Sequence, residues 1–367
     1  MQAAAVIREM GTGFNLGNTF DLAQHSTRIE DIRPIIDLYQ KAGMRHVRIP
    51  VTWGSGFKRD ALASGEGKVN TRHPRLSQLA AAVDYALGKG MYVVVNTHHE
   101  SWLKDGYDGS DAYDRAFGRL WEGIATYFKG RSPRLIFEVL NEPEKAFGDW
   151  SGRVKPFDLA ALELTRRINR VGYGAIRATG GPNAVRTVLV MPNGQGNQSL
   201  LARVYPDAKS LPGAGGDPFL AASVHTYDPW PFCGQNGKAS AWPGKAAIQA
   251  PIRAVAEHAR KLGIGVNYGE FGVGRERDQE SRDTDVVREY YRTVRLTALE
   301  HGMSVTPWDD RGWFRLVTRD GSGAYRFAYE IVPTMMAPGR ERGRFTPDSR
   351  RRPAARGSVV PGRRAAR

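Results

Sequence analysis

Residues 91–100, MYVVVNTHHE, and residues 134–143, RLIFEVLNEP, follow the same pattern: a nearly continuous apolar run that ends in polar residues. Apolar runs of this length are typical of parallel strands that are covered on both faces. The segment between them, residues 111–128, has the spacing of an amphipathic helix. A strand, a helix and a second strand in this order predict a βαβ unit with parallel strands.

The same alternation extends in both directions along the chain. Further strands are predicted over residues 11–18, 46–51, 187–192, 219–227, 265–270 and 303–308. Further helices are predicted over residues 29–42, 76–89, 158–178 and 283–300. Gly43, Gly90 and Gly302 stand where three of these helices end, as glycines at helix carboxyl termini commonly do.

Eight strands with starts about 42 residues apart predict an α/β fold of the (β/α)8 TIM-barrel type. A doubly wound parallel sheet is the alternative, because strand order cannot be read from a single sequence. No stretch rich in Gly, Pro and Ser divides the first 330 residues, which favours one catalytic domain over residues 1–336.

Composition sets further limits. The chain has 367 residues, 41% of them hydrophobic and 25% charged, which is the balance of a globular protein. No apolar run reaches 18 residues, so no membrane span is expected. Cys233 is the only cysteine, which excludes an intramolecular disulfide and a zinc site built on several thiolates.

The net charge of +15 is concentrated at one end of the chain. Residues 333–367 contain ten arginines and two acidic residues, a net charge of +8. We predict that residues 337–367 form a disordered basic tail, because they have too little apolar surface to fold. The folded domain is not expected to bind nucleic acid, and a polyanion-binding protein acting through the tail is the alternative from another class.

The first residues, MQAAAVIREMGTG, contain no apolar segment of the kind that a secretory signal needs. The compartment is therefore left open between a cytoplasmic location and one outside the cytoplasm.

Polar residues follow nearly every predicted strand. Such strand ends would lie at one face of a barrel, the face that carries active sites in this architecture. The residues are Asn15, Asn18, Arg48, His98, His99, Asn141, Glu142, His225, Tyr227, Glu270 and Trp308.

Two of these residues form a candidate catalytic pair. Glu142 stands in Asn-Glu-Pro after the fourth strand, and Glu270 ends the seventh strand. Strands four and seven lie nearly opposite each other in an eight-stranded barrel, so both carboxylates are expected in one cleft. Glycoside hydrolysis uses such a pair, one protonated as general acid and the other ionised.

No cofactor and no metal is predicted. The pair His98-His99 would point to opposite sides if both residues lay on one strand, which argues against a shared metal ion. The glycines near residues 11–13 lack a full dinucleotide-binding pattern, and no Gly-Lys-Ser/Thr phosphate loop is present. Nothing near Cys233 would activate it as a nucleophile.

Seven strand-end motifs together resemble glycoside hydrolase family 5, the cellulase-like retaining β-glycosidases, from about residue 11 to about residue 313. They are GFNLGNTFD (13–21), RHVRIPVTW (45–53), VVVNTHHE (93–100), IFEVLNEP (136–143), VHTYDPW (224–230), NYGEFG (267–272) and TPWDD (306–310). The loop FCGQNG (232–237) and the pair Asp309-Asp310 depart from the family's pattern, which bears on specificity.

The resemblance implies a role for each residue. Glu142 would be the general acid/base and Glu270 the nucleophile, with their carboxyl groups about 5–5.5 Å apart. Arg48 and Tyr227 would hold Glu270 ionised, and Asn141 would bind the sugar 2-hydroxyl. The remaining substrate-binding residues would be His98, His99, His225, Trp308, Asn18 and Asp21. Of these, Asn18 and Asp21 would contact sugar hydroxyls in the negative subsites. An extracellular or periplasmic location would also fit the family.

Tryptophans near the strand ends favour a polysaccharide substrate, since their rings can pack on pyranose rings. Those proposed to line the cleft are Trp53, Trp102, Trp230, Trp242, Trp308 and Trp313, whereas Trp121 and Trp150 fit a core position better. We therefore expect a monomeric endo-β-1,4-glucanase acting on a β-linked polysaccharide. A β-mannanase or xyloglucanase is the alternative within the family, and a non-catalytic carbohydrate-binding barrel is the alternative outside it.

Overall fold

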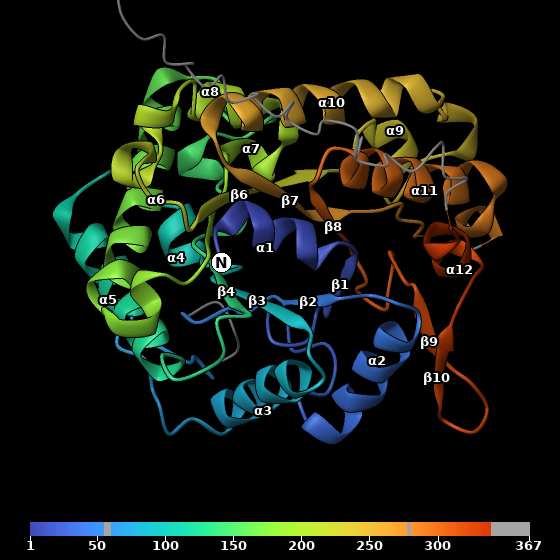
Figure 1. Ribbon diagram of the computed structural model, residues 1–367, viewed down its shortest axis with the longest axis horizontal. Coiled ribbons are helices and arrows are strands. Elements are labelled where there is room, and N and C mark those ends of the chain that lie inside the picture. The colour runs from blue at the N-terminus through green and yellow to red at the C-terminus, as the bar shows by residue number, and fades with distance from the viewer. Residues whose placement is uncertain (55–59, 277–279, 339–367) are drawn as a thin grey trace, which may run out of the picture. The chain divides into compact units, whose positions relative to one another are not determined.

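Eight parallel strands close into a barrel in which each strand pairs with its neighbours along the chain (Figure 1). They are β1 (Gly13–Asn15), β2 (His46–Ile49), β3 (Tyr92–Asn96), β4 (Leu135–Glu138), β5 (Val188–Val190), β6 (Leu220–Thr226), β7 (Gly265–Phe271) and β8 (Ser304–Pro307). Thr12, directly before β1, bridges Val305 of β8 in parallel register and joins the last strand to the first. The predicted (β/α)8 barrel is confirmed.

The computed structural model describes residues 1–54, 60–276 and 280–338. Contacts among these residues group Met1–Met336 as one compact unit. From residue 339 onward the basic tail predicted over 337–367 lies outside the described residues, so its disorder stays a prediction. Within the described part of the chain, no helix is long and apolar enough to cross a membrane.

The strands are buried on both faces, as their apolar runs predicted. In β3, Val93 and Val95 belong to the large core shared with the surrounding helices. Tyr92 and Val94 point to the other side, into a smaller cluster inside the barrel. This alternation follows from the two-residue period of a strand.

Helices surround the barrel (Figure 1). The longer ones that follow strands are α2 (Ile29–Lys41), α3 (Pro74–Gly88), α5 (Asp111–Tyr127), α6 (Leu159–Ala178), α10 (Lys245–Leu262) and α11 (Asp285–Glu300). Short helices in the loops are α4 (Ser101–Lys104), α7 (Asn193–Gly196), α8 (Leu201–Val204) and α9 (Trp230–Cys233). The 3-10 turns are Lys145–Phe147, Gly181–Ala184, Gln198–Leu200, Ala208–Ser210, Pro212–Gly215, Ala239–Ala241 and Glu280–Asp283.

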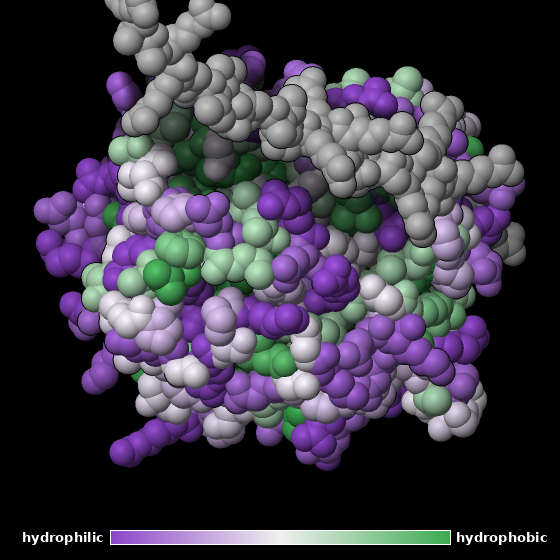
Figure 2. All heavy atoms as spheres, viewed as in Figure 1, coloured by the Kyte–Doolittle hydropathy of each residue, from purple (hydrophilic) through white to green (hydrophobic). Residues whose placement is uncertain are grey.

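The helices are amphipathic, with an apolar side toward the barrel and a polar side outward. In α2, Ile32 and Ile36 are buried whereas Glu30 and Arg33 are exposed. Figure 2 shows the result on one face of the molecule, where mostly hydrophilic side chains cover the region of α2 and α3. The glycines predicted to end helices, Gly43, Gly90 and Gly302, all have the left-handed backbone that favours glycine.

Helix α1 (Ala3–Met10), which the sequence analysis did not predict, closes the barrel at the amino-terminal end of its strands. Its residues Ile7 and Met10 pack into the inner cluster with Val94 of β3 and Ile136 of β4. At Gly265 a Cβ atom would lie 2.8 Å from Ile7, so β7 approaches α1 this closely because residue 265 is glycine. Figure 1 shows α1 lying across the strands.

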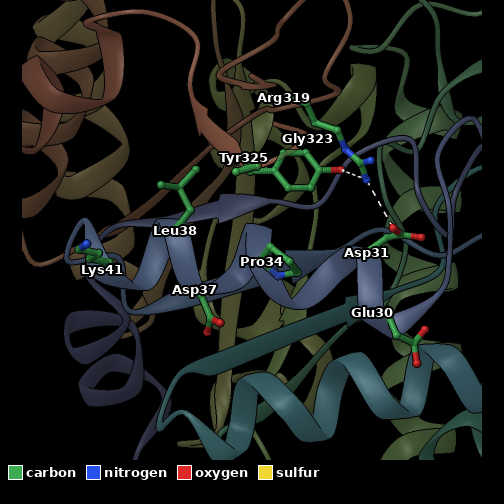
Figure 3. A pocket seen from close by; sticks show the side chains of 10 residues that line it. Glu30, Asp31, Pro34, Asp37, Leu38, Lys41, Arg319, Gly323 and Tyr325 are labelled. Atoms are coloured by element: carbon green, nitrogen blue, oxygen red, sulfur yellow. Dashed lines mark hydrogen bonds and ion pairs between the residues drawn. The ribbon is translucent and has the colours of Figure 1, made fainter. Parts of the chain in front are cut away.

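After β8 the chain forms a hairpin, β9 (Val317–Arg319) and β10 (Tyr325–Phe327), and the short helix α12 (Ile331–Met336). The hairpin was not predicted from the sequence. A recess lies between the hairpin and α2, where Arg319 contacts both Asp31 and Tyr325 (Figure 3). None of the predicted site residues lines this recess.

Candidate active site

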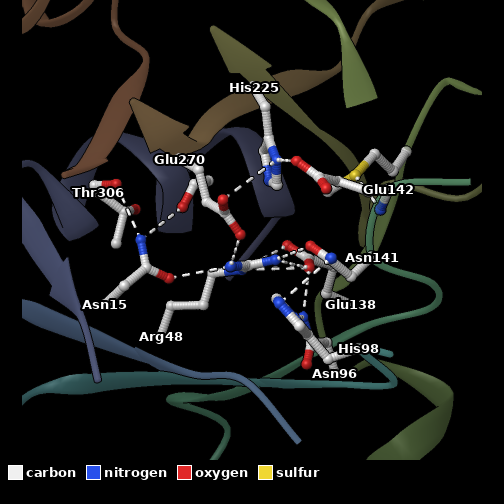
Figure 4. A network of polar contacts seen from close by, with 12 residues as sticks. Asn15, Arg48, Asn96, His98, Glu138, Asn141, Glu142, His225, Glu270 and Thr306 are labelled. Carbon is white, nitrogen blue, oxygen red and sulfur yellow. Dashed lines mark hydrogen bonds and ion pairs between the residues drawn. The ribbon is translucent and has the colours of Figure 1, made fainter. Parts of the chain in front are cut away.

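The carboxyl ends of the strands bring the predicted polar residues together, and Arg48 stands at the centre of the network they form (Figure 4). Its Nη1 donates to Glu270 Oε1 at 2.7 Å and to Asn15 Oδ1 at 2.9 Å. Its Nη2 donates to Asn141 Oδ1 at 2.6 Å and to Glu138 Oε1 at 2.6 Å. A single buried guanidinium thus links side chains from β1, β2, β4 and β7.

Glu270 lies in this network at the end of β7. Besides the contact with Arg48, its Oε2 accepts a hydrogen bond from the Tyr227 hydroxyl at 2.9 Å. The Nδ1 atom of His225 lies 3.7 Å from the same oxygen. Burial raises the pKa of Glu270 above its ordinary value, and the positive charge of Arg48 opposes that rise. Two fixed donors therefore orient the carboxylate.

A β-bulge aims Glu270 into the cleft. The pairing of β7 with β6 shifts by one residue between Tyr268 and Glu270, so Gly269 is the extra residue. A Cβ atom at Gly269 would overlap the Ser223 hydroxyl and lie 3.1 Å from His225 Nε2. The Tyr-Gly-Glu order is therefore a local requirement, because only glycine allows the two strands to approach at the bulge.

Glu142 faces Glu270 across the cleft from the loop after β4. Its backbone is left-handed, with φ +43°, a strained conformation for a residue other than glycine. Its Oε1 lies 2.8 Å from His225 Nδ1, and its side chain is 23% exposed. Burial raises the pKa of Glu142 to about 7, opposed by the charge of Lys104. This carboxyl group can therefore hold a proton near neutral pH.

The two carboxyl groups share one small space. An oxygen of Glu142, an oxygen of Glu270 and a ring nitrogen of His225 all lie within 4.8 Å of one another. Burial lowers the pKa of His225 to about 4, so its imidazole is neutral at neutral pH. Two carboxyl groups this close, in different environments, can divide the roles of acid and nucleophile.

Asn141 and His98 form the wall beside the pair. Because Arg48 donates to Asn141 Oδ1, the amide nitrogen of Asn141 turns toward the His98 ring, 3.3 Å from Nε2. The His98 ring is parallel to the Trp308 indole, with 5.9 Å between ring centroids. Burial lowers the pKa of His98 well below its usual range, so the ring is uncharged. Trp308 thus lies beside His98, and its role as a sugar platform stays a prediction.

Asp21 lies deeper than predicted. Its side chain is fully buried, and neither carboxylate oxygen has a hydrogen-bond partner among the described residues. His99 Nε2, on a side chain 41% exposed, is 3.9 Å from Asp21 Oδ2. The predicted contact between Asp21 and a sugar hydroxyl is therefore wrong for this structure, because no atom of Asp21 reaches the surface. Asn18 is partly exposed and donates to Gln24.

The argument that His98 and His99 point to opposite sides is also wrong. Strand β3 ends at Asn96, so the alternation of a strand no longer applies at these two residues. Their ring centroids are 4.4 Å apart, edge to face. Among the described residues, two groups of side chains have a spacing suited to a metal ion: Asp21 with His98 and His99, and Glu142 with His225 and Glu270. That the protein uses no metal stays a prediction.

The tryptophans divide differently from the prediction. Trp230 and Trp313 are 55% and 46% exposed, and their place in the cleft stays a prediction. Trp53, however, is fully buried, with its indole donating to the Asn96 carbonyl. Trp150, predicted for the core, is 45% exposed, whereas Trp121 is buried as predicted. Position after a strand end does not decide burial, because loops fold back over the rim.

Glu138 was missed by the sequence analysis. It is the last residue of β4, fully buried, and holds Arg48 through three contacts of 2.6 to 3.2 Å. Asn96 of β3 donates to it at 2.9 Å. A signal was present, because a glutamate inside an apolar strand needs a buried cation or a comparable partner.

Comparisons with known proteins agree with this geometry. Residues 8–310 match the model of the family Cellulase (glycosyl hydrolase family 5). Endoglucanase A of Clostridium longisporum is 28% identical over 332 residues, which are 84% of this chain and 59% of the relative. Endoglucanase B of Clostridium cellulovorans is 31% identical over 324 residues, 84% of this chain and 68% of that protein.

Among solved structures, the GH5-4 broad specificity endoglucanase from Clostridium longisporum is similar in fold. Its TM-score is 0.73 at 24% sequence identity, and the match covers 92% of this chain and 97% of that one. The chain spans about three fifths of the first curated relative, 59% of its length.

Proposed function

Because this chain belongs to the cellulase family, glycosyl hydrolase family 5, we propose that it is a retaining endo-β-1,4-glucanase that cleaves a β-linked polysaccharide by double displacement. One observation carries the proposal. Glu142 and Glu270 approach within 4.8 Å, close to the separation of about 5–5.5 Å that retaining enzymes use. Inverting enzymes need a wider gap, which leaves room for a water molecule.

In the first step Glu270 attacks the anomeric carbon, and Glu142 transfers its proton to the leaving glycosidic oxygen. The C1–oxygen bond to the departing chain breaks as the bond from Glu270 forms, which gives a glycosyl-enzyme ester. In the second step Glu142, now ionised, takes a proton from water. That water attacks C1, and Glu270 leaves with its negative charge restored.

The surrounding residues support these two roles. Arg48 and Tyr227 hold Glu270 in its ionised form and orient it toward C1. His225 contacts Glu142 and orients its carboxyl group. In this proposal Asn141, whose amide oxygen accepts from Arg48, binds the sugar 2-hydroxyl, and Trp308 offers a flat apolar surface to the ring.

Rescue by azide distinguishes the roles of Glu142 and Glu270. With an aryl β-cellobioside, which needs little protonation of its leaving group, Glu270→Ala should lose several orders of magnitude in turnover, and azide should restore part of it as α-cellobiosyl azide. In Glu142→Ala, azide should instead attack the glycosyl-enzyme and give the β-azide. NMR of the products distinguishes the two. Wild-type turnover in either variant, or the same anomer from both, would refute the assignment.

The substrate and the assembly state belong to the same proposal. We expect carboxymethylcellulose to be the preferred substrate in a panel with glucomannan, xyloglucan and xylan, with reducing ends measured for each. Higher turnover on glucomannan or xyloglucan would move the assignment to the alternatives within the family. A monomer is expected in sedimentation equilibrium.

A further inference from the structure

Glu138 is a third carboxyl group beside the candidate pair, and Arg48 contacts both Glu138 and Glu270. Glu138 lies at the end of β4 and is fully buried, as is Arg48. Arg48 directs Nε and Nη2 to Glu138 but only Nη1 to Glu270. Figure 4 shows the guanidinium between the two carboxylates. Arg48 thus makes more contacts with Glu138 than with Glu270.

The charges of Arg48, Glu138 and Glu270 interact strongly because all three side chains are buried. An uncompensated arginine beside Glu270 would stabilise the carboxylate, lower its pKa and make it a weaker nucleophile. Glu138 supplies the compensating charge. Burial pushes the pKa of Glu138 upward, but Arg48 and the donating Asn96 more than offset this, so the pKa is lowered and Glu138 is ionised.

From this arrangement we propose that Glu138 is a positioning residue for the reaction. It fixes the Arg48 guanidinium in place and neutralises it, so that Arg48 orients Glu270 without quenching its reactivity. The inference rests on the proposed role of Glu270 as nucleophile.

Several other charged or titratable groups face Glu270, and their contacts with Arg48 must be compared with that of Glu138. The titratable and charged groups that face it are Arg48 from β2, Glu138 and Glu142 from β4 and its loop, His225 and Tyr227 from β6 and its end, and, at longer range, Asp21 and Lys104. Of these, Glu138 is the carboxylate in direct contact with Arg48 besides Glu270 itself.

Glu138 also anchors the wall of the site. The Asn96 side chain donates to Glu138 Oε1 at 2.9 Å, and the same amide nitrogen lies 3.1 Å from His98 Nδ1. The side-chain Oδ1 of Asn96 accepts a hydrogen bond from the Val51 backbone N–H at 3.1 Å, which fixes the orientation of the side-chain amide. The nucleophile and the His98 wall thus share one buried support.

The test is the pH dependence of covalent inactivation by 2,4-dinitrophenyl 2-deoxy-2-fluoro-β-cellobioside. Glu270 attacks C1 and dinitrophenolate leaves without needing a proton, so Glu142 is not required. In Glu138→Gln, Arg48 acts on Glu270 alone. The acid limb of the inactivation rate should therefore move to lower pH by at least about 0.5 unit, and the plateau should fall by about tenfold or more.

Glu100→Gln is the matched control. Glu100 is equally buried, but it accepts hydrogen bonds from the backbone of Trp53 and Gly54 and from the Trp102 indole instead of from Arg48. Its acid limb should stay at the wild-type pH. Glu138→Asp keeps the charge at a shorter reach, so its limb should also stay near wild type while its plateau falls. This second variant covers the case in which Glu138→Gln does not fold.

An unshifted acid limb in Glu138→Gln, or a shifted one in Glu138→Asp, would overturn the inference. If Glu138→Gln loses thermal stability but keeps the wild-type acid limb, or if Glu138→Asp shifts the limb of an otherwise folded protein, Glu138 does not set the reactivity of Glu270. Failure of the proposed function has a different signature: the wild-type enzyme would then not be labelled on Glu270, as peptide mass spectrometry would show.

Discussion

Glu142 combines strain and protonation at a single residue. The left-handed backbone places its side chain against His225, and burial raises its pKa to about 7. Pro143 behind it and the Met191 sulfur, which accepts from the Glu142 backbone N–H, help hold this conformation. Strained residues persist where the surrounding structure determines their conformation, and they concentrate at active sites.

The raised pKa predicts the basic limb of the pH profile. General acid catalysis needs protonated Glu142, so kcat/KM on a polysaccharide should fall above about pH 7, approaching tenfold per unit. With 2,4-dinitrophenyl β-cellobioside, whose leaving group needs no proton, that limb should disappear. A basic limb that persists with the activated substrate would show that another group titrates.

Asp21 gives a stability prediction with a defined sign. Burial raises its pKa from 3.8 to about 7, so the folded state keeps a proton that the unfolded chain has lost. Its contribution to stability is present below about pH 4 and lost as pH rises to about 7. Asp21→Asn does not titrate, so its unfolding free energy relative to wild type should increase by a few kcal/mol between pH 4 and pH 8.

Urea unfolding of both proteins at the two pH values measures this difference, and groups that titrate equally in both proteins cancel. A constant difference between variant and wild type would mean that Asp21 is ionised in the folded protein throughout this range.

At the scale of elements, the packing of α6 against β4 supports the acid/base loop from behind. Gly172 faces Val139, just past the end of β4, and a Cβ atom there would overlap the Val139 side chain and lie 3.1 Å from Trp121. Gly174, two residues along the same helix, is exposed and has open space around it. Close packing therefore requires glycine at residue 172, whereas no contact requires it at residue 174.

Alanine substitutions at the two positions should have opposite effects on stability. Gly172→Ala should lower the unfolding free energy by about 1–3 kcal/mol through overpacking, despite the better helix propensity of alanine. Gly174→Ala should raise it by about 0.5–1 kcal/mol, since only the propensity changes. Thermal and urea unfolding provide the comparison. Equal effects at the two positions would contradict the close contact with Val139.

Some helices and strands could be predicted from the sequence and others could not. The eight strands were predicted from their apolar runs, and α2, α3, α5, α6 and α11 were predicted from their helical spacing. Helix α10, helix α1 and the β9–β10 hairpin were not predicted. Helix α1 has only eight residues, and the hairpin lies outside the repeated alternation of strands and helices.

Across the whole molecule, the two ends of the barrel have different tasks. The carboxyl ends of the strands carry the polar network around Arg48, whereas α1 seals the opposite end with apolar residues. Barrels of this type place catalysis at one end and stability at the other.

One substitution at the sealed end tests this division. Ile7 is fully buried in the inner cluster, so Ile7→Ala should lower the unfolding free energy by about 2–5 kcal/mol while kcat/KM at a permissive temperature stays at the wild-type value. Arg8→Ala, at the exposed neighbouring position, is the control and should change stability little. A large loss of kcat/KM in folded Ile7→Ala would show that the two ends are coupled.

The sequence by itself determined the alternation of strands and helices, the polar strand ends and the resemblance that singled out Glu142 and Glu270, because each depends on a short local pattern. Only the tertiary structure decided that Glu138 forms an ion pair with Arg48, that Asp21 is fully buried, and that Trp53 is buried while Trp150 is exposed. Each of these depends on contacts between segments far apart in the chain. The physical reason is that burial and charge compensation depend on which side chains the closed barrel brings within a few ångströms, and a local pattern does not contain that distance.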